Sequence, residues 1–431
     1  MDSERAETFL RLLTEAELRH AAQPDRQRLT EVGEALITVG ALDRAAAAAI
    51  EADFELAIAA REPRQEPRQA PGTVYRNVYS RPPGRTTAAA APPSVPGLLV
   101  PLDTRLPITS DQWTGELRLL AFLQDTGGAW FAAHARMTGT QPAARPGRWY
   151  RPLGMDPARG LSMIDDAGYE YGLGMLSSGS AEPREFPGQM HVQPSPRRRL
   201  RWVEIAQLGA PAIRIGLDQA TAGPAITVTG VERTPAECLL DQYAAGILAS
   251  RDRPAALGDI LAAMEAAAAL PSLSPLPGQL ARLCERHGVT GHGISAAPVA
   301  EEKLPERWLS DQERPTTPWP QRQAAAAVAA LPELDGVRLD IIGVTSSDRS
   351  TLLHLHAEDD AMQVLGSGPA FWIRDQRGGW HATHRAGGRT GNGHAFLQLS
   401  IWPPLNMAST IDVFACGRSA EVRVTLPLNW G

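Results

Sequence analysis

The stretch TLLHLHAEDD, residues 351–360, alternates apolar and polar side chains and ends in three acidic residues. Successive side chains of an extended strand point to opposite faces, so Leu353 and Leu355 share one face and His354 and His356 share the other. The leucines predict a strand that covers a hydrophobic core, and the histidines are expected to point outward. The stretch therefore predicts an antiparallel sheet with one buried face.

The same texture of short alternating runs broken by Gly, Pro and Asp fills two long regions, residues 98–232 and 336–431. Each region contains about seven candidate strands, and AITVTGV (residues 225–231) is a possible eighth strand of the first. This number and spacing of strands favours an immunoglobulin-like antiparallel β-sandwich in each region. The Cys–Trp–Cys pattern of antibody domains is missing, so only the architecture is predicted.

Helical periodicity precedes each β region, in residues 1–60 and 233–290. Asp43 is a plausible N-cap, and Thr234 with Glu237 three residues later has the spacing of a capping box. Two proline-rich segments complete the chain. Residues 61–97 read as a Pro/Arg-rich linker, and residues 291–335 as a Pro-rich connector with a short helix.

The order of helical module, proline-rich segment and β region occurs twice. A shift of 222 residues lays Leu119, Leu120 and His134 on Ile341, Ile342 and His356, and shifts of 230, 228 and 209 align other segments in the same order. We therefore predict an α+β multidomain protein, a tandem duplication of a helical module plus an immunoglobulin-like antiparallel β-sandwich.

Composition limits the classes of function. The net charge of -6 argues against a globally basic nucleic-acid binder, and three scattered cysteines cannot form a disulfide framework. No apolar run is long enough to cross a membrane. Arginine is used almost to the exclusion of lysine, with Lys303 the only lysine, as GC-rich codons favour. A soluble protein of the bacterial cytoplasm is expected.

Histidines of the second β region are the candidate metal ligands. His354 and His356 could bind zinc if a neighbouring strand brought His381 or Asp359 close to them. The alternative interpretation is the polar surface of a strand. In the first half only His134 has a counterpart here, while Ala132 corresponds to His354, so the fold does not require the histidine pair.

Two basic segments are candidate binding sites for a partner. The run SPRRRLRW contributes Arg197, Arg198, Arg199 and Arg201, and the first linker interleaves Tyr75 and Tyr79 with arginines. Guanidinium and aromatic groups together can bind an acidic protein, a phosphate or a nucleic acid. A solvated loop and an ordinary linker are the alternative interpretations.

Motifs of catalysis are missing from the sequence: it contains no P-loop, no dinucleotide fingerprint, no nucleophile elbow and no HExxH. We therefore expect a non-catalytic protein-interaction or scaffold protein without a cofactor, whose partner is another protein. The alternatives are a zinc-dependent enzyme or metal sensor that uses the histidines, and binding of a polyanion or nucleic acid through the Arg197–Arg201 loop.

Overall fold

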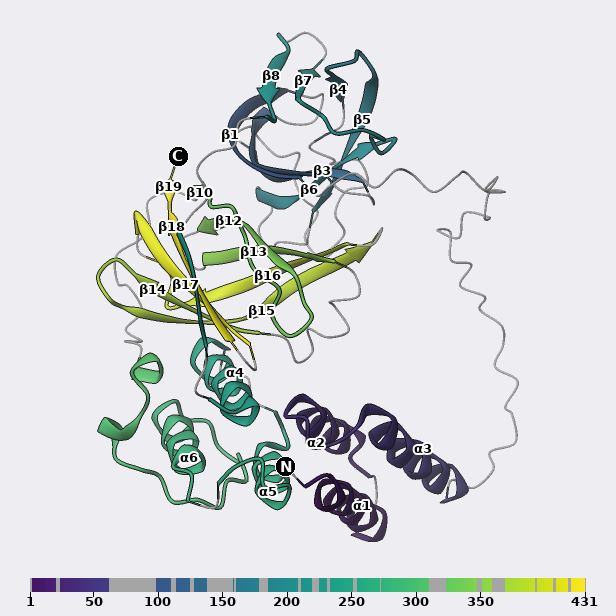
Figure 1. Cartoon of the computed structure of the whole chain (residues 1–431), viewed down its shortest axis with the longest axis vertical. Helices are drawn as coiled ribbons and strands as arrows, with labels where there is room; N and C mark the ends of the chain where they lie inside the picture. Colours follow the sequence, from purple (N-terminus) through teal and green to yellow (C-terminus); the bar gives the residue numbers. More distant parts are fainter. Residues whose placement is uncertain are drawn as a thin grey trace, which may run out of the picture.

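The computed structural model is described for most of the chain. The described residues are 2–20, 24–61, 98–109, 114–124, 128–137, 158, 160–177, 185–207, 211–218, 225–230, 233–250, 254–271, 273–309, 323–346, 351–358, 369–391, 394–405, 408–417 and 420–430. They form three layers, with the helices at one end, the larger sheet in the middle and the smaller sheet at the other end (Figure 1).

The helical layer is built from both predicted helical regions. Its helices are α1 (Ser3–His20), α2 (Arg26–Thr38), α3 (Arg44–Arg61), α4 (Pro235–Ser250), α5 (Leu257–Ala266) and α6 (Leu276–Arg286). One hydrophobic cluster joins them, because α2 packs against α5, α1 against α5, and α2 against α4. Of these described helices, none combines the length and the apolarity that a membrane span requires.

The predicted capping box at the start of α4 is confirmed. The amide of Thr234 donates to the Glu237 carboxylate at 2.6 Å and the amide of Glu237 donates to the Thr234 hydroxyl at 3.3 Å, a reciprocal capping box at the start of α4. The chain leaves α2 and α5 through similar turns, in which Gly40 (φ 72°) and Ala268 (φ 51°) adopt the left-handed conformation. Glycine adopts this conformation without strain, and alanine adopts it at a cost.

The first sheet contains eight antiparallel strands. They are β1 (Leu98–Thr109), β2 (Thr114–Gln124), β3 (Ala129–Met137), β4 (Leu161–Asp165), β5 (Glu170–Ser177), β6 (Glu185–Gln193), β7 (Trp202–Gln207) and β8 (Ile213–Gly216). Their order across the sheet is β1-β2-β3-β6-β5-β4-β7-β8. The sheet curls round one core, and all eight strands contribute side chains to it.

The second sheet contains eleven strands. They are β9 (Ala225–Gly230), β10 (Gln323–Ala326), β11 (Ala329–Ala330), β12 (Leu339–Ser346), β13 (Thr351–Glu358), β14 (Ala370–Asp375), β15 (Trp380–Gly391), β16 (His394–Trp402), β17 (Thr410–Cys416), β18 (Ala420–Pro427) and β19 (Asn429–Trp430). Their order is β19-β10-β12-β13-β16-β15-β14-β17-β18-β9, and β11 pairs with β12. This sheet also encloses a core of its own.

Three strands lie in a different place from the one their position in the sequence suggests. AITVTGV, expected in the first β region, forms β9 and pairs with β18 of the second sheet. The predicted connector 291–335 contains the short 3-10 helices η1 (Glu301–Lys303) and η2 (Glu306–Leu309), but it also contributes β10 and β11. Alanine-rich sequence reads as helix by propensity, and pairing with β12 overrides that propensity.

The two sheets share one plan. Reading β12, β13, β14, β15, β16, β17 and β18 against β2 to β8 gives the same order of strands in both. The β2–β3 ladder has an irregularity between Leu119 and Ala121, and the β12–β13 ladder has one between Ile341 and Gly343, the positions that a shift of 222 makes equivalent. Each sheet also has a cis proline directly after the equivalent strands β6 and β16.

A matched hairpin supports this correspondence. Asp165 between β4 and β5 accepts hydrogen bonds from the amides of Ala167 and Tyr169 at 2.8 and 3.0 Å. Asp375 between β14 and β15 accepts from the amides of Arg377 and Gly379, both at 2.8 Å. In both turns the aspartate therefore organises the backbone of the residues that follow it.

The prediction of α+β architecture with large antiparallel sheets is confirmed. The described strands of each sheet form one continuous hydrogen-bonded array, whereas an immunoglobulin-like sandwich is divided into two sheets packed face to face. The core of each region is therefore enclosed by the curvature of a single sheet.

The two sheets meet along a seam formed by corresponding strands. Leu120 and Trp130 of the first sheet pack with Ile342 and Phe396 of the second in a small hydrophobic cluster of its own. Arg118 of β2 crosses the seam: its Nη2 donates to the carbonyl of Asn429 at 3.1 Å and its Nη1 donates to the carbonyl of Ala324. The helices lie beyond the second sheet, at the end of the molecule away from the first sheet (Figure 1).

Candidate functional site

His354 and His356 of β13 lie in the seam between the two sheets. As predicted, Leu353 and Leu355 are buried in the core of the second sheet, and His354 and His356 lie on its other face. The expectation that this face is exposed is wrong, because the first sheet covers it. His356 is only 6% exposed. The alternation of a strand predicts which residues share a face, but not whether another layer covers that face.

His354 is held as a neutral hydrogen-bonding group. Its Nε2 lies 2.8 Å from the Thr345 hydroxyl of the neighbouring strand β12. Burial, and then the charge of His134 of the first sheet, together lower the pKa of His354 to about 3. An imidazole that stays neutral down to this pH serves packing and cannot act as a proton carrier near neutral pH.

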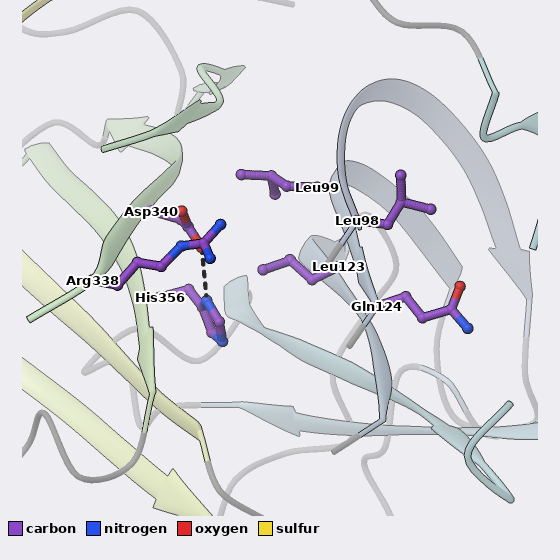
Figure 2. A pocket seen from close by; sticks show the side chains of 7 residues that line it. All are labelled: Leu98, Leu99, Leu123, Gln124, Arg338, Asp340 and His356. Atoms are coloured by element: carbon purple, nitrogen blue, oxygen red, sulfur yellow. Dashed lines mark hydrogen bonds and ion pairs between the residues drawn. The ribbon is translucent and has the colours of Figure 1, made fainter. Parts of the chain in front are cut away.

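His356 lies beside a small cleft at the end of the seam. Its Nδ1 is 3.2 Å from Oδ2 of Asp340, and its ring packs against Phe396 with 5.0 Å between centroids. Figure 2 shows this pair and Arg338 on one side of the cleft, with Leu99 and Leu123 of the first sheet opposite. The cleft has a volume of about 60 Å³. An apolar cavity that binds benzene measures about 150 Å³, so this cleft admits only water-sized groups.

His381 does not join the other two histidines. In the register of the sheet His354 lies opposite Gln398, and Gln398 lies opposite Gly387, so His381 is six residues further along β15. At about 3.3 Å per residue this separation is roughly 20 Å. Within the residues that the structure describes, no group of three or more His, Cys, Asp or Glu side chains could hold a metal ion.

His381 occupies a position that the first half fills with another residue. Its Nε2 is 3.6 Å from the carboxylate of Asp375, and its Nδ1 is 2.6 Å from the carbonyl of Pro403. In the first sheet the Tyr171 hydroxyl donates to the carboxylate of Asp165 at 2.8 Å. Tyr171 and His381, two chemically different side chains, thus lie against equivalent aspartates of the two hairpins. The position of His381 therefore indicates a structural role.

Acid is expected to destabilise the fold through His354. The unfolded chain binds a proton at His354 near pH 6.5 and the folded protein only near pH 3, so stability falls as the pH drops through this window. At pH 4 we expect this residue to account for a loss of about 3 kcal/mol. Urea unfolding between pH 7 and 4 measures it, and His354→Gln should remove this part of the pH dependence. His292→Gln, in the helical layer, is the control; an identical pH profile for wild type and His354→Gln would contradict the prediction.

The predicted arginine loop is partly used inside the protein. Arg198 pairs with Asp165 at 3.0 Å and with Asp166 at 2.8 Å, so it anchors the loop to the β4–β5 hairpin. Burial alone would raise the pKa of Asp165, but hydrogen bonds from the Tyr169 amide and the Tyr171 hydroxyl, and the charge of Arg198, lower it.

The other arginines of the loop are solvent-facing. Arg197, Arg199 and Arg201 are exposed, and no described carboxylate forms an ion pair with them. Tyr75 and Tyr79 lie outside the described residues. The predicted basic site is therefore represented in the described chain by three exposed guanidinium groups and one that is internally paired.

Strand β9 presents the most unusual surface. It forms one end of the second sheet, and no strand of the described chain pairs with its outer edge. All six of its residues are exposed. Ile226 and Val228 lie opposite Val424 and Val422, which are fully buried, so the apolar face of the sheet continues onto β9 after the core has ended.

Among the described residues, the edge of β9 has none of the features that protect sheet edges. Its sequence AITVTG contains no charge and no proline, and its ladder with β18 is regular from Ala225 to Gly230. Natural sheets protect such edges with lysine, proline, bulges or a covering element. An extended strand that has none of these can accept a further strand through its outward backbone N–H and C=O groups.

A buried network of charges links α4 to the second sheet and was not foreseen from the sequence. Asp241 accepts from the indole of Trp308 at 2.7 Å and pairs with Arg233 and Arg307, and both arginines also reach Glu421 at 3.4 Å. Its members come from three distant segments, so no local spacing could indicate it. Burial, and then the charge of Glu421, raise the pKa of the adjacent Cys416 thiol, so this cysteine is not a nucleophile.

Comparisons with known proteins give no family. No protein-family description matches the sequence, and no curated protein is significantly similar to it. One solved structure, "The crystal structure of the conserved domain protein from Bacillus anthracis", aligns with 77% of this chain and 80% of its own at 9% identity. Its TM-score of 0.16 is too low to support an argument about the fold.

Proposed function

We propose that this chain is a non-catalytic protein-interaction or scaffold protein, and that it assembles through the edge of β9. The observation that carries the proposal is an uncharged edge strand in which every residue is exposed, with Ile226 39% and Val228 54% exposed. Strand addition uses the backbone for affinity and alternate side chains for specificity. The location in a bacterial cytoplasm stays a prediction based on composition.

The occupant that best fits this edge is β9 of a second copy. An antiparallel pairing centred on Thr227 would bring Ile226 of one copy opposite Val228 of the other, and each Thr227 opposite its equivalent. The apolar pair would lie on the face of β9 that continues the core face of the sheet, and the threonines would lie on the opposite face. Because the strand carries no charge, two copies meet without repulsion.

A cysteine at the centre of this pairing tests both the partner and the register. Antiparallel neighbours have Cα atoms about 4.5–5.5 Å apart, within the range of about 4.4–6.8 Å that a disulfide spans. Thr227→Cys is therefore expected to form a covalent dimer under mild oxidation, seen on a non-reducing gel. The native cysteines are buried, and Tyr169→Cys, on an exposed hairpin of the first sheet, is the matched control. A monomer, or equal dimer from both variants, would overturn the proposal.

Charge on the same strand gives the complementary test. Sedimentation of the wild-type chain should show a concentration-dependent dimer, and Val228→Lys should make it monomeric without unfolding, because this side chain is 54% exposed. Tyr169→Lys, at 64% exposure, should leave the dimer intact. If the wild-type chain is monomeric up to the highest soluble concentration, a second copy is not the occupant.

We propose in addition that the two halves arose by tandem duplication. The shared order of strands, the equivalent ladder irregularities and the matched hairpins at Asp165 and Asp375 support it. Near the end of each half, the amide of Leu217 donates to the carbonyl of Arg201, and the amide of Leu428 donates to the carbonyl of Ser409. Leu217 therefore corresponds to Leu428, an offset two residues larger than the shift of 209 that aligns the sequences of β8 and β18. A closer relation to immunoglobulin domains remains a prediction from strand number and spacing.

A further inference from the structure

A cavity lies where α4 crosses the second sheet. Its volume is about 220 Å³, and it is lined by α4 on one side and by residues of β13, β14, β15 and β16 on the other. Ala245 and Gly246 of α4 line one side, and Leu355, Phe371 and Leu397, which belong to the core of the second sheet, line the other. The cavity is independent of β9 and of the seam between the sheets.

The walls of this cavity are apolar over most of their surface. Leu355, Phe371 and Leu397 are each at most 5% exposed, so their side chains form fixed walls. Packed interiors rarely contain voids larger than a water molecule. A cavity of this size exceeds the roughly 150 Å³ that accommodates benzene in an apolar protein interior. The apolar walls offer few hydrogen bonds to water, so they favour an apolar group.

The polar lining comes from Thr383, His384 and Arg385 of β15 and from Gln242 of α4. Arg385 carries the permanent charge of this lining and is exposed. No described carboxylate forms an ion pair with Arg385. A guanidinium at the exposed side of an apolar cavity can bind the charged head of an anionic ligand while the body of the ligand lies inside.

We infer that this cavity binds a small amphipathic carboxylate, with a short chain or single ring between α4 and the sheet and its head group at Arg385. Cavities between structural layers, apolar with a few convergent polar groups, are the usual sites of small ligands. Within the described residues no helix packs on the corresponding face of the first sheet, so the cavity depends on the contact of α4 with the second sheet.

The test uses three probes with the same eight-carbon chain: octanoate, octanol and octylamine. Saturation-transfer NMR and calorimetry on the full chain should give the tightest binding for octanoate, about tenfold tighter than for octylamine. Arg385→Gln should reduce the affinity for octanoate about tenfold, toward that of octanol, while leaving octanol unchanged. Arg377→Gln, an exposed arginine of the β14–β15 turn, should have no effect.

A second variant blocks the apolar part of the site. Ala245→Leu extends a side chain into the cavity and should abolish binding of all three probes. If this variant does not fold, the comparison of Arg385→Gln with Arg377→Gln still decides the question. Octanoate binding that is equal in wild type and Arg385→Gln, or no binding of any probe up to about 10 mM, would overturn the inference.

Discussion

Arg118→Ala is expected to destabilise the protein by about 3–5 kcal/mol, because it removes a buried charge that is paired and hydrogen-bonded. Arg118 is 4% exposed, and its Nε donates to Asp103 at 2.8 Å. The same guanidinium donates to two backbone carbonyls of the second sheet, at Ala324 and Asn429. Its removal would leave both carbonyls without this donor at the seam.

The loss should also change how the protein unfolds. Each sheet has a core of its own, and the hydrophobic contact between the sheets is a small cluster. We therefore expect calorimetry to show the first sheet unfolding at a lower temperature than the rest in Arg118→Ala. Arg105 lies opposite Arg118 on β1 but is exposed, so Arg105→Ala should cost less than about 0.5 kcal/mol. Equal effects of the two variants would contradict this assignment of Arg118.

Asp241→Ala is expected to have an effect of similar size, about 3–5 kcal/mol, on the contact between α4 and the second sheet. The Asp241 carboxylate is 3% exposed and holds Arg233, Arg307 and the indole of Trp308. Burial alone would lower the pKa of Arg233, but the charge of Asp241 raises it, so the arginine stays charged. Without Asp241 two partly buried arginines would share Glu421 alone.

Chemical denaturation of Asp241→Ala measures this loss. Asp241→Asn keeps the shape and the hydrogen bond from Trp308 but removes the charge. An effect as large as that of Asp241→Ala assigns the loss to the charge, and a smaller effect assigns the difference to packing and the hydrogen bond. Glu285→Ala, which removes an exposed pair with Arg282 on α6, is the matched control and should change stability by less than about 0.5 kcal/mol. A loss for Asp241→Ala no larger than that of the control would show that the network is dispensable.

The comparison of equivalent positions shows why the two sheets have different neighbours. On β14 and β15 the residues Ala370, Trp372 and Ala382 are buried against the helical layer. The hairpin correspondence of Asp165 with Asp375 puts Ser162 at the position of Trp372 and Gly172 at that of Ala382. A face of serine and glycine has little apolar surface to bury, and none of the described helices packs there. The helices from both halves instead pack together and cover the second sheet.

The candidate sites were predicted to different degrees. The alternation in TLLHLHA correctly separates Leu353 from His354, but the burial of His356 depends on the first sheet, more than 200 residues away in sequence. AITVTGV is recognisable as a strand, yet its position at the end of the second sheet depends on β18. Arg198 is recognisable as part of a basic run, but its partners Asp165 and Asp166 are not.

The sequence by itself determined the local features of this protein: the helices with the cap at Thr234, most strands, and the repeated order of elements. These follow from interactions within a few residues and from the period of the hydrophobic pattern. Only the tertiary structure decided which faces are covered, where β9 pairs, and that His354 and His381 are separate. Contacts between distant segments decide these features. The alternating pattern of a strand shows which residues share a face, and it is the same whether or not a second layer packs on that face.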